Sequence, residues 1–61
     1  MVKVVVGDIK KFLKEYVGLE VVKEIEEMDD NKMIELEEAL KLLNKYYTPE
    51  TAMFFKIALD I

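Results

Sequence analysis

The sequence contains no cysteine, histidine, tryptophan, arginine, serine or glutamine. Without cysteine and histidine, the chain can form neither a disulfide framework nor a zinc site built on thiolates or imidazoles. The usual pairs of a nucleophile and a base in covalent catalysis need serine, cysteine or histidine, so these are excluded as well. We therefore expect a protein that is not an enzyme, with no catalytic residue, no metal site and no cofactor.

Glycine and proline are scarce, with two glycines and one proline in 61 residues. These residues mark turns and linkers, so the chain has few points at which it could divide into separate units. No linker, low-complexity segment or internal repeat is visible. We expect residues 1–61 to form a single small helical domain.

Long hydrophobic runs are also missing, because no apolar stretch approaches the roughly 18 residues that a membrane span needs. The valine-rich start is too short for a signal peptide. We therefore expect a cytoplasmic protein with no membrane partner. Lysine is the only basic residue and glutamate the main acidic one, a thermophile-like composition. The restricted set of residue types also fits an engineered scaffold with no natural function.

The first elements can be assigned from side-chain shape and spacing. Residues 2–6 are nearly all valine, and β-branched side chains favour a short strand. Gly7 and Asp8 then predict a turn and a helix cap. Beyond them, apolar residues from Ile9 to Val17 recur at helical spacing, and Gly18 is typical of a helix C-terminus.

The middle of the chain predicts two further helices. Apolar residues from Val21 to Met28 form a new helical stripe. The cap-forming residues 29–31 should end that helix and start a third one at about residues 31–46. That third helix carries an apolar seam that could pack within the chain or against a second copy.

The C-terminal segment allows two interpretations. Thr48, Pro49 and Glu50 match a helix start, which predicts a fourth helix. Apolar residues also alternate along residues 55–61, as in a half-buried strand. We therefore expect a mainly α fold, a small three- to four-helix bundle with a short N-terminal strand or extended arm. The alternative is an α+β fold with residues 2–6 and 53–61 paired as strands.

Burial can be predicted from the same stripes. The expected buried set is Ile9, Phe12, Leu13, Tyr16, Val22, Ile25, Met33, Leu36, Leu40, Leu43, Phe54, Ile57 and Ala58.

Apolar residues make up 52% of the sequence, more than a chain this short can bury alone. We therefore expect a non-catalytic module for protein–protein interaction or homo-oligomerisation, most simply a homodimer. The predicted interface combines the valine arm with the apolar C-terminal segment. Its residues are Val4, Val6, Met53, Phe54, Phe55, Ile57 and Ile61.

Acidic residues concentrate in one stretch, with nine acidic and two basic side chains between Glu20 and Glu38. This stretch predicts either an ordinary solvated surface or a second docking surface for another protein. Part of it resembles the calcium loop of EF-hand proteins, whose ligand spacing is matched by Glu27, Asp29, Asn31, Glu35 and Glu38. Lys32 stands where that family has its turn glycine, so no metal ligand is assigned.

Residues 47–61 resemble the end of helix-turn-helix repressor and antitoxin domains, where a Ser/Thr-Pro-Glu start leads into a helix rich in alanine and leucine. The resemblance implies a small DNA-binding regulator, which is the alternative function. A DNA-binding face needs cations, and the net charge is −4 with no arginine. The basic helix face consists of Lys10, Lys11 and Lys14, so we do not expect nucleic acid as a partner.

Overall fold

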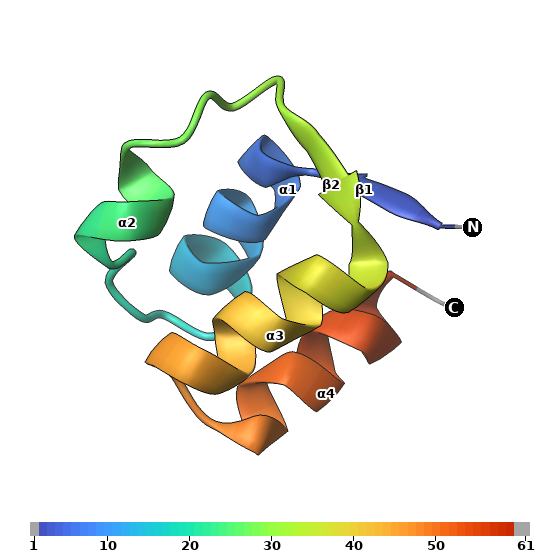
Figure 1. Cartoon of the computed structure of the whole chain (residues 1–61). Helices are drawn as coiled ribbons and strands as arrows, with labels where there is room; N and C mark the ends of the chain where they lie inside the picture. The colour runs from blue at the N-terminus through green and yellow to red at the C-terminus, as the bar shows by residue number, and fades with distance from the viewer. Residues whose placement is uncertain (1, 60–61) are drawn as a thin grey trace.

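The computed structural model describes residues 2–59, and the mainly α fold with a short N-terminal strand is confirmed (Figure 1). Within this range no helix is long and apolar enough to cross a bilayer. The elements, in chain order, are β1 (Lys3–Val5), α1 (Val6–Lys11), the π-helix η1 (Phe12–Tyr16), α2 (Lys23–Glu26), β2 (Met33–Glu35), α3 (Leu36–Tyr46) and α4 (Pro49–Ala58).

The two strands form an antiparallel pair, and each runs directly into a helix. The register pairs Lys3 with Glu35, Val4 with Ile34 and Val5 with Met33. The ladder continues past both strands, because the Val6 amide donates to the Lys32 carbonyl (2.9 Å) and the Leu36 amide to the Val2 carbonyl (2.8 Å). The first amide of each following helix therefore has a backbone partner without a side-chain cap.

The two strand–helix units repeat each other at an offset of 30 residues. Val4 and Ile34 are buried at the centres of the strands, Leu13 and Leu43 are buried in the following helices, and Lys11 and Lys41 are exposed. The repeat is not visible in the sequence, because most of the equivalent positions in residues 3–17 and 33–47 carry different residues. The structure reveals one because equivalent positions have the same side-chain environment.

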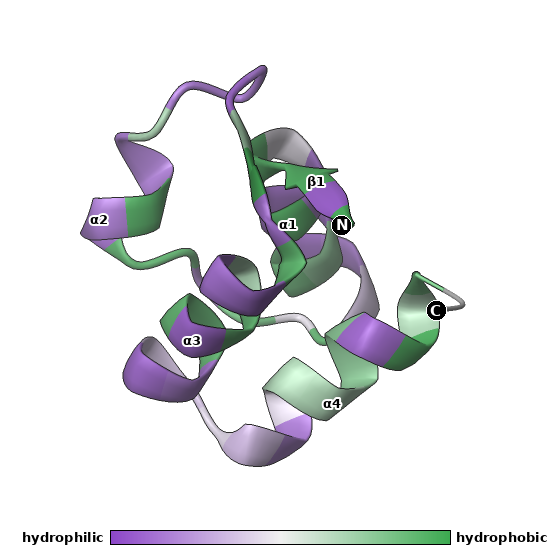
Figure 2. Cartoon of the chain, turned by 45° about the vertical axis from the view of Figure 1, so that its right-hand side comes forward, coloured by the Kyte–Doolittle hydropathy of each residue, from purple (hydrophilic) through white to green (hydrophobic). Residues whose placement is uncertain are grey.

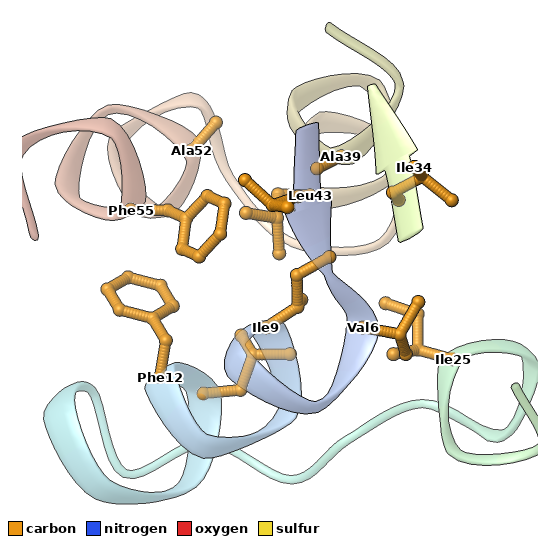
Figure 3. Packing of buried hydrophobic residues seen from close by; sticks show 11 residues of the cluster. Val6, Ile9, Phe12, Ile25, Ile34, Ala39, Leu43, Ala52 and Phe55 are labelled. Atoms are coloured by element: carbon orange, nitrogen blue, oxygen red, sulfur yellow. The ribbon is translucent and has the colours of Figure 1, made fainter. Parts of the chain in front are cut away.

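The core lies between the paired strands and the helices that follow them (Figure 3). The Phe12 and Phe55 rings meet edge to face, with centroids 5.1 Å apart, and connect η1 to α4. Ile25 is fully buried and attaches the short α2 to this core. The buried apolar residues are Val4, Val6, Ile9, Phe12, Leu13, Ile25, Ile34, Ala39, Leu43, Ala52 and Phe55.

The first helix begins earlier than the sequence predicts. Gly7 and Asp8 lie inside α1 rather than in a preceding turn. The Gly7 amide donates to the Asp30 carbonyl (2.8 Å), so the loop before β2 supplies the partner that a capping residue would otherwise provide. The predicted C-terminal glycine is confirmed, because Gly18 has a φ of +65° just after η1.

The region before α3 is the main correction to the predicted elements. The sequence predicts a helix from residue 31, but residues 33–35 form β2 and α3 begins at Leu36. Asp29 does not cap this helix, because its Oδ1 accepts from the Asn31 amide (2.8 Å) in a local turn. The pairing with β1 outweighs the local helical tendency of residues 31–35. The helix before them, α2, is only four residues long, shorter than the predicted stripe.

The C-terminal segment is helical, as the main prediction states. The Thr51 amide donates to Thr48 Oγ1 (3.2 Å), and Pro49 occupies the first turn. The alternative pairing of residues 2–6 with residues 53–61 is wrong, because β1 pairs with β2 and α4 extends to Ala58. Residues 60 and 61 lie outside the described range.

Burial agrees with the prediction in part. The confirmed buried residues are Ile9, Phe12, Leu13, Ile25 and Leu43. Val22, Leu36 and Leu40 are half-buried. The prediction is wrong for Tyr16, Met33, Phe54, Ile57 and Ala58, which are exposed. Met33 is exposed because strand alternation turns Ile34 inward instead.

Candidate interaction face

Helix α4 is apolar on two opposite sides. Ala52 and Phe55 face the core, at 5% and 1% exposure. Met53, Phe54 and Ile57 lie on the outer side and keep 59%, 52% and 64% of their surface exposed. In Figure 2 most of α4 is coloured hydrophobic, whereas α2 and α3 carry large hydrophilic stretches. A helix with apolar residues on two opposite sides normally has both sides covered, and one side of α4 is open in the described structure.

The π-helix η1 extends this apolar surface. Tyr16 is 73% exposed, and its ring lies 6.1 Å from the Phe12 ring, which in turn packs against Phe55 of α4. The Val17 amide donates to the Phe12 carbonyl (3.2 Å), the i to i+5 pattern of a π-helix. Single π turns are rare and are frequently found at functional sites.

An open groove of about 410 Å³ runs between η1 and α4. Its lining is almost entirely apolar and consists of Phe12, Tyr16, Val17, Phe54, Ile57 and Ala58. We call these residues together with Met53 the η1–α4 face.

Charges of both signs border the η1–α4 face. A smaller hollow of about 160 Å³ shares Phe12 and Tyr16 with the groove and has Asp8 and Lys11 at its edge. Glu50 and Lys56 are exposed on α4 itself. An apolar centre with a polar rim is the usual arrangement of a protein interface.

The predicted interface residues separate into three groups in the structure. Met53, Phe54 and Ile57 are exposed together on α4. Val4, Val6 and Phe55 are buried in the core of their own chain, which corrects their assignment to an interface. Ile61 lies outside the described residues.

The predicted interface does not include four members of this face: Phe12, Tyr16, Val17 and Ala58. Tyr16 shares a helical stripe with the buried Ile9 and Phe12, so its spacing predicts burial. The available signal was the C-terminal segment, in which only two of residues 52–61 are charged. A helix this apolar needs cover on two sides, and the described part of the chain covers one.

The acidic stretch does not assemble the EF-hand-like ligand set. Ile34 lies in β2, and α3 follows that strand. Among residues 2–59, however, no three side chains of the Asp, Glu, His or Cys type converge in a way that could hold a metal ion. The calcium spacing seen in the sequence therefore has no matching geometry.

The predicted basic helix face is also incomplete. Lys10 is 9% exposed, and its ammonium donates to groups of the loop before β2. Lys14 lies 3.8 Å from a Glu26 carboxylate oxygen. Lys10 cannot contribute to a face that binds nucleic acid, because its ammonium is held within the protein and cannot reach a phosphate.

Comparison of the chain with models of protein families, with curated proteins and with solved structures finds no match in any of the three.

Proposed function

We propose that this protein is a non-catalytic interaction module that associates with a second copy of itself through the η1–α4 face. The observation that carries the proposal is the two-sided apolar character of α4, with Met53, Phe54 and Ile57 open to solvent. A cytoplasmic location, expected from the sequence, is part of the same proposal.

The area of the face supports a weak and reversible dimer. The exposed parts of Tyr16, Met53, Phe54 and Ile57 together present on the order of 400 Å², given about 150–250 Å² for a whole aromatic side chain. The largest apolar patch on an ordinary monomer measures about 300–600 Å² and is often functional. A standard interface buries about 800 Å² per partner, so the charged rim must supply the rest. We expect a Kd on the order of 10–100 µM.

The distribution of charge favours contact between two η1–α4 faces. The acidic stretch Glu20–Glu38 includes α2, β2 and the first turn of α3. Of these elements, α2 lies on the other side of α1 from α4 (Figures 1 and 2). Two copies joined through α4 therefore keep their α2 regions apart. The rim offers Asp8 and Glu50 alongside Lys11 and Lys56, so a two-fold arrangement can pair opposite signs.

The test is the mass of the protein by sedimentation equilibrium between about 10 and 500 µM. The native chain should shift from monomer to dimer over this range. Ile57→Glu should weaken association at least about tenfold, because it places an unpaired charge at the centre of the contact. Phe54→Glu should act in the same way.

Met33→Glu is the matched control, because Met33 is 58% exposed on β2, outside the η1–α4 face. It should leave the association unchanged. A native chain that stays monomeric throughout, or a Met33 variant as disruptive as the Ile57 variant, would refute the proposal.

A further inference from the structure

The side chain of Lys10 ends inside the loop that follows α2. Its Nζ donates to the Glu26 carbonyl (3.0 Å), the Met28 carbonyl (2.7 Å) and Asp30 Oδ1 (2.6 Å). An ammonium has three N–H donors, so each of them has one acceptor. The lysine side chain is 11% exposed, whereas the side chain of its partner Asp30 is 71% exposed, so the ion pair lies at the edge of the protein interior.

The acceptors form the kind of oxygen set that hard metal cations bind. Two backbone carbonyls and one carboxylate converge from the last residue of α2 and the loop that follows it, and calcium sites in proteins are built from such oxygens. These atoms differ from the EF-hand-like set suggested by the sequence, since the loop directs the Glu26 and Met28 carbonyls and the Asp30 side chain to the common point.

The loop needs a positive charge at that point. Its five residues carry four carboxylates, of which Asp30 points an oxygen to that centre, together with the carbonyl oxygens of Glu26 and Met28. Without a cation these oxygens would repel one another. The loop is also held close to α1, where a Cβ atom on Gly7 would come within 3.1 Å of the Asp30 carbonyl oxygen.

We propose that the loop Glu26–Asp30 is a cation-binding loop that the chain fills with the ammonium of its own Lys10, and that accepts a hard metal ion such as Ca²⁺ when this ammonium is removed. The lysine occupies the centre of the oxygen set, so the native chain has no room there for a metal ion.

The experiment compares the thermal unfolding of the native chain and Lys10→Met in EDTA and in about 10 mM CaCl₂, with choline chloride at matched ionic strength. Methionine keeps an unbranched apolar side chain that is one atom shorter than lysine, and it removes the charge. In EDTA the variant should unfold about 5–15 °C below the native chain, because three loop oxygens lose their donor. Calcium should raise the unfolding temperature of the variant by about 5 °C or more and leave that of the native chain unchanged.

Two control variants make the result specific to the loop. Lys14→Met removes a neighbouring charge near Glu26 and should show no calcium response. Adding Asp30→Asn to Lys10→Met should abolish most of the response, because it removes the carboxylate ligand.

Three results would overturn the proposal: a Lys10→Met variant as stable as the native chain, a destabilised variant that no calcium concentration restores, or a native chain that itself gains stability from calcium. If the variant is unfolded in EDTA, folding on addition of calcium supports the proposal and continued unfolding refutes it. A measurement on the native chain is independent of any variant. The Lys10 ammonium protons should give a slowly exchanging ¹H–¹⁵N signal, and its absence would also refute the proposal.

Discussion

At the scale of single residues, Tyr47 shows how one hydroxyl can organise a loop. It donates to the Glu20 carbonyl (2.7 Å) and accepts from the Val22 amide (2.9 Å), which ties the end of α3 to the segment between η1 and α2. Tyr47→Phe should lower the free energy of unfolding by about 1 kcal/mol, because two backbone groups lose their partner. Urea unfolding measures this loss. Tyr46→Phe, at the adjacent position, is the control, and an equal loss in both variants would contradict the role of Tyr47.

Asp30 should make the stability depend on pH. Its hydrogen bond and charge interaction with Lys10 lower the pKa of the carboxyl below the ordinary value of 3.8. Because the folded-state pKa is depressed, the contribution of Asp30 is fully present above the unfolded pKa and is lost as the pH falls through the folded pKa.

The corresponding measurement is urea unfolding of the native chain and Asp30→Asn at pH 6 and at successive values below pH 4. At pH 6 the native chain should be more stable than Asp30→Asn. This difference in the free energy of unfolding should vanish below the folded-state pKa of Asp30. A difference that persists unchanged at low pH would show that the carboxylate is not its source.

The roles of Lys10 and Tyr47 could not be predicted from the sequence. Lys10 and Tyr47 have partners that lie 16 to 27 residues away, and local spacing carries no information on such contacts. Lys10 even belongs to the predicted basic face of the first helix. The apolar spacing did predict Ile9, Phe12 and Leu13 correctly, because one helical face against a core is a local property.

At the scale of elements, the start of α4 is the clearest case in which a local sequence motif, Thr48-Pro49-Glu50, correctly predicts a helix start. Thr48 Oγ1 accepts from the Thr51 amide (3.2 Å) at the N-terminus of the helix. Thr48→Ala should therefore lower the free energy of unfolding by about 1 kcal/mol. Thr48→Ser should retain most of the stability that the cap contributes, because serine keeps the accepting oxygen. Chemical denaturation of the two variants checks this, and equal stability of all three proteins would contradict the cap.

The β1–β2 pair is the opposite case. The sequence predicts residues 33–35 to be helical. They form a strand instead, because β1 pairs with them from about 30 residues earlier in the chain. The valine run predicts β1 from side-chain shape alone. In contrast, β2 forms because it pairs with β1, and the local sequence of residues 33–35 gives no sign of that pairing. The same pairing moves the start of α3 from residue 31 to Leu36.

At the scale of the whole molecule, the sequence predicts an apolar surplus but not where it lies. Val4, Val6 and Phe55 are buried in the core, and Tyr16 is exposed on the surface instead. Which side of α4 faces inward depends on how the helix packs against α3 and η1. The surplus therefore concentrates on the η1–α4 face, for which we propose a second copy of the chain as the partner.

The most direct measurement is an isotope-filtered NOE spectrum of an equal mixture of ¹³C-labelled and unlabelled chains at about 1 mM. Contact through the η1–α4 face predicts NOEs between copies among the side chains of Tyr16, Phe54 and Ile57, and none to Met33. A spectrum without any NOE between copies, or one whose NOEs between copies arise only from residues outside the face, would contradict the proposed assembly.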